Sequence, residues 1–163
     1  MLALLVAAGA IPEQAEAGTG PVDVPTERLA VAPTVQSLTP FGAGIPLGAA
    51  SWQQPFDPAD HLPYAFSFEA LLDEGETIAA VERIALSSAG AALGVIIDQS
   101  TGFAPVIDAD GGQRIQLWFS VDPDMQNNAP FDADGAQVPV TFRVLTSKSH
   151  RIERTAVLTV RQL

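Results

Sequence analysis

The sequence contains no cysteine among its 163 residues. This absence excludes disulfide bonds, thiolate zinc sites and cysteine nucleophiles, because all three need that side chain. It leaves the redox conditions in which the protein works undetermined. The sequence also lacks the Gly-x-Ser-x-Gly, phosphate-loop and dinucleotide-binding patterns, so it contains no recognisable framework for nucleophilic or nucleotide chemistry.

Basic residues are few: eight lysines and arginines stand against 19 acidic residues, which gives a net charge of −11. A surface of this charge repels phosphate backbones and anionic lipid headgroups, so we expect neither nucleic acid nor membrane as a partner. The basic residues are unevenly spread, and five of the eight are Arg143, Lys148, Arg151, Arg154 and Arg161. Two interpretations stay open, a locally mixed surface and a docking surface for an acidic partner.

Histidine occurs only twice, at His61 and His150. Each lies beside turn residues, and neither has a partner at the spacing of a catalytic triad or a metal site. We therefore interpret both as surface histidines without a chemical role. With no other catalytic constellation in the sequence, we predict a protein that is not an enzyme and needs no cofactor.

Two aspartate pairs begin like calcium-binding loops, Asp108-x-Asp110-Gly and Asp132-x-Asp134-Gly. Calcium needs six or more oxygen ligands, and the EF-hand loop ends with a glutamate at its twelfth position. That position holds phenylalanine after the first pair and arginine after the second. We therefore predict turns between strands at both places, and no metal site.

The longest apolar run is residues 1–10, MLALLVAAGA. It is too short to span a bilayer. It resembles the apolar part of a secretory signal, but no lysine or arginine precedes Arg28, so the basic region of such a signal is missing. An exposed apolar decapeptide promotes aggregation, so we predict that it packs on its own domain or on a neighbouring subunit.

Residues 11–50 are rich in proline, glycine, alanine and threonine, and six prolines exclude a long helix there. Isolated apolar residues stand between the prolines, which a freely solvated linker would not need. We therefore predict an extended arm, partly polyproline-like, that lies along a surface, with a flexible linker as the alternative. The chain is accordingly divided into an N-terminal arm over residues 1–50 and a folded domain over residues 51–163.

Alternating apolar residues within the domain indicate half-buried strands. Residues 63–70 place Tyr64, Phe66 and Phe68 on one face, and residues 114–121 alternate in the same way with the odd-numbered positions inward. The sequence predicts shorter strands at 93–98 and 106–107, a turn at 73–76 and a polar loop at 122–136. Residues 77–86 fit either a helix or a strand, and their Thr, Ile and Val content and short length favour a strand.

The clearest pattern lies at the C-terminus, over residues 137–163. Even-numbered apolar positions from Val138 to Val144 alternate with polar ones, and the pattern returns from Ile152 to Val160 after a short polar connection. This predicts a β-hairpin. About six or seven short strands with turns between them predict an all-β fold, an immunoglobulin-like β-sandwich preceded by the arm.

Partner-binding residues are predicted from exposure and charge. Trp118 has the opposite parity to Ile115, Leu117 and Phe119, so we expect it to face outward, either as a contact surface or beneath the arm or the long loop. The full set of candidate contact residues is Leu2, Leu4, Leu5, Val6, Trp52, Trp118, Arg143, Lys148, Arg151 and Arg154.

Four segments resemble a known family in their order and spacing. They are residues 56–64 (FDPADHLPY), residues 72–78 (LDEGETI), residues 140–147 (VTFRVLTS) and residues 151–155 (RIERT). Together they are similar to the small virion proteins of tailed bacteriophages called fiber–tail adaptors. The resemblance covers residues 52–163 and implies an immunoglobulin-like fold, several copies in a symmetric assembly, and contacts with tail, fiber or capsid subunits.

The chain departs from the family pattern at three places. A longer segment, residues 122–136, replaces a tight Gly-Gly turn, His150 stands where a glycine is expected, and residues 1–50 lie outside the resemblance.

From the resemblance we expect a non-enzymatic structural protein of the virion that attaches fiber or spike to the tail. The alternatives are a capsid decoration protein, and a secreted or surface domain that recognises carbohydrate or protein.

Overall fold

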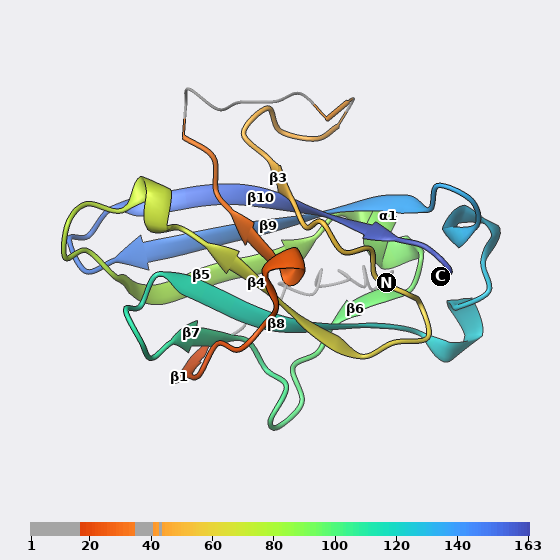
Figure 1. Cartoon of the computed structure of the whole chain (residues 1–163), viewed down its shortest axis with the longest axis horizontal. Helices are drawn as coiled ribbons and strands as arrows, with labels where there is room; N and C mark the ends of the chain where they lie inside the picture. Colours follow the sequence, from red (N-terminus) through yellow and green to blue (C-terminus); the bar gives the residue numbers. More distant parts are fainter. Residues whose placement is uncertain (1–16, 35–40, 43) are drawn as a thin grey trace, which may run out of the picture.

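The computed structural model describes residues 17–34, 41, 42 and 44–163, and these residues are mostly β-strand (Figure 1). The N-terminal candidates Leu2, Leu4, Leu5 and Val6 lie outside the described residues, so the predictions made for them stay predictions. Within the described part of the chain, no helix is long and apolar enough to cross a membrane.

The first sheet has six strands and is built around β8 (Arg114–Val121). This strand pairs antiparallel with β4 (Leu62–Ser67) on one edge, and with β6 (Val95–Ile97) and β7 (Val106–Asp108) on the other. Two short strands complete the sheet in parallel pairing. They are β1 (Gly18–Gly20), which lies beside β7, and β2 (Leu29–Val31), which lies beside β4.

The second sheet has the strand order β3-β10-β9-β5. The predicted C-terminal hairpin is confirmed as β9 (Ala136–Thr146) and β10 (Arg151–Val160), which pair antiparallel over their whole length. The other edge of β9 pairs with β5 (Ile78–Leu86), the strand expected at residues 77–86. The short strand β3 (Ala50–Ser51) runs parallel to β10.

Helical structure in the described residues is limited to short turns between strands. The single α-helix is α1 (Ser88–Ala92), which begins where the Ser87 side chain accepts a hydrogen bond from the Gly90 amide. The 3-10 turns are Thr26–Arg28, Glu69–Leu71, Pro123–Met125 and Ala129–Phe131. The prediction of an all-β fold is therefore confirmed.

The two sheets face each other across one aromatic core. The predicted inward positions of β4, β8 and β9 are buried, and Tyr64, Phe66 and Phe142 have no exposed surface. The rings of Phe66 and Phe142 lie 4.8 Å apart and join the two sheets. Alternation along these three strands thus identified the inner faces correctly, because side-chain direction reverses at every residue of a strand.

Trp52 belongs to this core, and its prediction as a partner contact is wrong. Only 3% of the residue is exposed, and its indole Nε1 donates a 2.7 Å hydrogen bond to the Ala65 carbonyl. Its ring also contacts Tyr64 and Phe142 edge to face. Trp52 follows β3, which pairs with β10 at the edge of the second sheet, so its side chain lies between the sheets.

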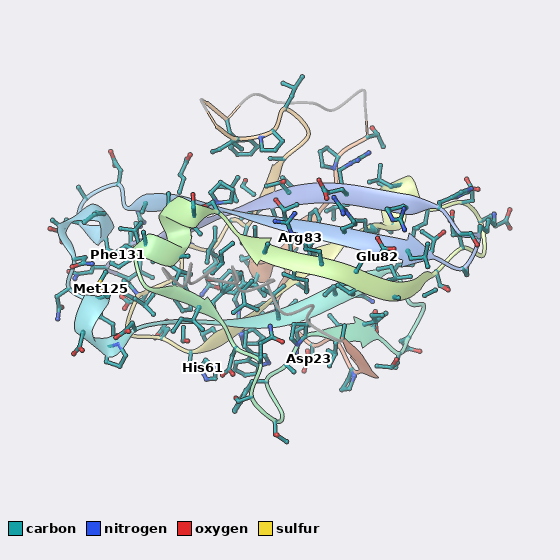
Figure 2. All side chains as sticks on the ribbon, turned by 180° about the vertical axis from the view of Figure 1, so that it is seen from behind. Asp23, His61, Glu82, Arg83, Met125 and Phe131 are labelled. Atoms are coloured by element: carbon teal, nitrogen blue, oxygen red, sulfur yellow. The ribbon has the colours of Figure 1, made fainter. Side chains whose placement is uncertain are left out.

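The predicted polar loop at residues 122–136 closes one end of the core. Phe131 is fully buried, and Met125 packs against the core beside it (Figure 2). The loop returns to β9 through Gly135, whose φ of +75° and close approach to Val160 exclude a side chain. The loop is therefore polar in composition but anchored by two apolar side chains.

The segment 21–28 connects β1 with β2 at opposite sides of the first sheet and crosses its outer face (Figure 1). The Asp23 amide donates to Gln116 Oε1 at 3.1 Å, and Arg28 Nη1 donates to the Pro63 carbonyl at 3.2 Å. We call residues 21–28 the strap. In its described part, the predicted arm thus contributes β1 and β2 to the first sheet and Ala50 of β3 to the second, and its standing as a separate unit stays a prediction.

Candidate partner-binding surfaces

The outer face of the first sheet carries a group of three aromatic rings, His61, Phe103 and Trp118, which we call the outer aromatic cluster. Trp118 lies on β8, His61 immediately precedes β4, and Phe103 lies in the connection between β6 and β7. The centroid distances are 4.7 Å between His61 and Phe103, and 5.0 Å from Trp118 to each of them. The prediction that Trp118 faces outward is confirmed.

This cluster is partly open to solvent. Phe103 is 36% exposed, Trp118 is half-buried, and the neighbouring outward residue Ile96 on β6 is 45% exposed. Ile96 pairs with Ser120, which has the same parity as Trp118 on β8. The apolar surface therefore extends across β6 and β8, beyond the part of the sheet that the strap covers.

The imidazole of His61 has an acidic partner. Its Nε2 lies 3.0 Å from Asp98 Oδ2, and Asp98 Oδ1 accepts a 2.7 Å hydrogen bond from the Ser100 amide. Hydrogen bonds from Ser100, and then from His61, hold the pKa of Asp98 below its ordinary value. The prediction that His61 lies at the surface is confirmed, because the residue is exposed. The fold adds an acidic partner that sequence spacing did not indicate, because Asp98 lies far from His61 in the sequence.

His150 also has an acidic partner, the buried carboxylate of Glu76. Only 1% of Glu76 is exposed, and its Oε1 lies 2.9 Å from His150 Nδ1. The same oxygen accepts a short hydrogen bond from the Thr146 hydroxyl, and Oε2 accepts one from the Asp73 amide at 2.9 Å. The hydrogen bond from Thr146 is the largest cause of a lowered Glu76 pKa. His150 is exposed, as predicted, and its acidic partner is again one that sequence spacing did not indicate.

The Glu76 group joins two turns of the second sheet. Glu76 precedes β5, while Thr146 and His150 flank the turn between β9 and β10. Ligand atoms of Asp73, Glu76 and His150 lie within 4.8 Å of one another, a spacing that a metal ion can use. However, Lys148 Nζ lies 3.2 Å from Asp73 Oδ2, and both Glu76 oxygens accept hydrogen bonds. The arrangement therefore works as a polar link between the turns.

The two calcium-like pairs form turns, as predicted. Asp108 Oδ1 accepts a hydrogen bond from the Asp110 amide at 3.0 Å, and its Oδ2 lies 2.9 Å from Arg114 Nε. The Asp132 carbonyl accepts from the Gly135 amide at 2.9 Å. The carboxylate of Asp108 therefore has a guanidinium as its counter-charge.

The predicted cationic residues do not form one surface. Arg143 Nη2 lies 2.7 Å from Glu153 Oε2, and Arg151 Nε lies 2.6 Å from Glu82 Oε2. Hydrogen bonds from Arg151 lower the pKa of Glu82, and Glu82 raises the pKa of Arg151.

The other two predicted cations lie elsewhere. Lys148 pairs with Asp73, and Arg154 has the opposite parity to Arg143 and Arg151 in the register of the hairpin, so its side chain leaves the other face of the strand. These charges are largely balanced within the chain.

One arginine on the outer face of the second sheet was missed. Arg83 lies on β5 directly opposite Arg143 of β9, is exposed, and has no acidic partner among the described residues (Figure 2). The register shifts between Ile78 and Ala80 and between Val81 and Arg83, so simple alternation does not predict the direction of this side chain. No other sequence pattern points to this residue.

Comparison of the chain with protein-family models, with curated proteins and with solved structures found no match.

Proposed function

We propose that this chain is a non-enzymatic structural component of a tailed-bacteriophage virion, where it attaches fiber or spike to the tail. The outer aromatic cluster carries the proposal, as an exposed contact surface on a rigid sheet. Aromatic side chains are enriched at protein interfaces, because a large ring buries much apolar area with little loss of rotational freedom. The role needs several copies of the chain and partners among the tail, fiber or capsid subunits.

The strand pairing supports the immunoglobulin-like part of this proposal. In the constant-type immunoglobulin fold, strand E lies between B and D in one sheet, and strand F lies between C and G in the other. Here β8 lies between β4 and β7, and β9 lies between β5 and β10. In chain order, β4, β5, β7, β8, β9 and β10 correspond to strands B to G, with β6 as an added short strand.

The position of the cluster supports a docking role. The Trp118 side chain is braced by its cross-strand neighbour Pro63 and by the ring of His61, and Asp98 fixes that imidazole. A pre-organised aromatic surface loses little conformational entropy when a partner binds. The rings therefore have the rigidity and exposure typical of an interface hot spot.

The test begins with the particles of the phage that encodes this sequence. Mass spectrometry of purified virions, separated into tails and capsids, should detect the chain with the tails. Detection with the capsids would instead support a decoration protein, and absence from particles would contradict the virion proposal.

A variant series then tests the cluster. Trp118→Ala combined with Phe103→Ala should lower the number of copies per particle by at least about tenfold, the effect of losing an interface hot spot. Leu47→Ala is the matched control, because Leu47 is 55% exposed and lies outside the cluster. Equal incorporation of both variants would show that another surface makes the attachment.

A further inference from the structure

We propose that the outer aromatic cluster receives Arg83 of a second copy of this chain, so that copies join head to tail. This inference rests on the docking role proposed for the cluster, and it names the partner. Two features carry it. The first is the unpaired guanidinium of Arg83 on the outer face of the second sheet. The second is the outer aromatic cluster on the first sheet, together with the unpaired carboxylates of Asp60 and Asp23.

Arg83 supplies the donor side of the contact. It lies directly opposite Arg143 in the register of β5 and β9, and like charges in facing positions repel each other. Arg143 is compensated by Glu153, whereas Arg83 has no counter-charge among the described residues. An anionic or aromatic group from another molecule would therefore relieve the repulsion and bind the free guanidinium.

The acceptor side has the chemistry that a guanidinium prefers. Tryptophan and phenylalanine faces attract arginine through cation–π contacts, and Trp118 and Phe103 are both accessible. Two exposed aspartates are neighbours of the cluster in the chain or in the sheet. Asp60 directly precedes His61, and the backbone amide of Asp23 donates to Gln116, which has the parity of Trp118 and lies two positions before it on β8. No described residue pairs with the side chain of either aspartate.

The two surfaces lie on opposite sides of the molecule. His61 and Asp23 are at the first sheet, and Arg83 is on the second sheet (Figure 2). A contact between two different surfaces is heterologous, so it generates a closed ring or an open row of copies. The net charge of −11 disfavours non-specific association of copies, so the contact depends on this local complementarity.

The test is sedimentation velocity of the full chain over a range of concentrations, with two single variants. Wild-type protein should form oligomers, while Arg83→Glu and Trp118→Ala should each weaken association by at least about tenfold. A 1:1 mixture of the two variants should then form dimers, because the intact cluster of the first can receive Arg83 of the second.

Two controls keep the result specific. Arg154→Glu changes the net charge by the same amount as Arg83→Glu but on the opposite face of its strand, and Leu47→Ala removes an exposed apolar side chain elsewhere. Both should associate like wild-type protein. The inference is overturned if wild-type protein is monomeric at every concentration, if either single variant still forms oligomers like the wild type, or if the mixed variants stay monomeric.

Failure of this inference can be distinguished from failure of the proposed function. A monomeric wild-type chain whose cluster variant no longer enters particles would leave the docking role intact and identify a different virion partner. A chain that forms oligomers through Arg83 and Trp118, but whose cluster variant still enters particles, would support the contact between copies and contradict the attachment role of the cluster.

Discussion

The first sheet carries aromatic groups on both of its faces, and the two groups differ in what covers them. On the inner face, Tyr64, Phe66 and Phe119 all contact Trp52 of the second sheet, and each of the four is at least 97% buried between the sheets. On the outer face, the cluster around Trp118 has the strap on one side and solvent on the other. Similar rings therefore stabilise the core on one face and remain available for a partner on the other.

Adjacent residues of one strand illustrate this difference. Phe119 has no exposed surface, while its neighbour Trp118 is half-buried. Strand periodicity assigns them to opposite faces, but it does not say which face a second layer will cover. Covering elements come from distant segments, here the second sheet and the strap, so they decide which aromatic group is structural.

The largest expected loss of stability comes from a substitution at the inner face of the first sheet. Trp52→Ala should lower the free energy of unfolding by about 3–5 kcal/mol, the usual cost of removing a buried aromatic side chain. It also leaves the Ala65 carbonyl without the indole donor. Urea unfolding followed by circular dichroism measures the change. A loss no larger than that of Trp118→Ala would contradict the contrast between the two faces.

The next prediction concerns the pH dependence of stability that comes from Glu76, a buried carboxylate at the end of the sandwich. Because the pKa of Glu76 is lower in the folded chain, its ionised form stabilises the fold at any pH above the ordinary glutamate pKa. That stabilisation is lost as the pH falls through the lowered folded value. Glu76→Gln should therefore be less stable at neutral pH, and its melting temperature should decrease less on acidification.

Melting curves recorded from about pH 7 to about pH 3 measure this effect. Glu153→Gln is the control, because its carboxylate pairs with Arg143 on the exposed surface, where an ion pair contributes little. A Glu76→Gln variant that loses stability with acid as steeply as the wild type would exclude Glu76 as a source of the pH dependence.

A smaller loss of stability is expected from removing the hydroxyl of Tyr64, the polar group among the inner aromatic rings. The Tyr64 hydroxyl donates to the Pro55 carbonyl at 3.1 Å, and burial raises the pKa of this phenol. Tyr64→Phe keeps the ring and removes that hydrogen bond, so we expect a loss of about 1 kcal/mol in urea unfolding. A loss as large as that of Trp52→Ala would mean that the hydroxyl, and not the ring, stabilises this part of the core.

The smallest effect on folding is expected at the outer face. Trp118→Ala should change the free energy of unfolding by about 1 kcal/mol or less, because the ring is half-buried and its ring contacts, His61 and Phe103, are themselves exposed. The same unfolding experiment measures it. A loss of 3 kcal/mol or more, the range given above for Trp52→Ala, would identify the cluster as a second core instead of a surface.

Much of the fold follows from local patterns. Alternation at residues 114–121 and in the C-terminal hairpin predicted the strands and their inner faces, because a two-layer sheet protein buries one parity of each strand. Trp52 could not be placed in this way. It stands outside any alternating run, and its burial results from the pairing of β3 with β10.

The candidate site was predictable only in part. The outward direction of Trp118 followed from parity. Its neighbours His61 and Phe103 come from two other segments, and no regular interval in the sequence relates them to Trp118. The acidic partners of the histidines were missed for the same reason. Arg83 was missed because two register shifts in β5 break the alternation that a sequence pattern needs.

The parallel pairing of β3 with β10 has a consequence for how the chain folds during synthesis. Ala50 pairs with Ala156, so β3 is synthesised long before the strand that it pairs with. Such non-local contacts slow folding, because a long loop must close before the pairing stabilises it. The edge of the second sheet and the burial of Trp52 should therefore be completed only after β10 has left the ribosome, as a late step in folding.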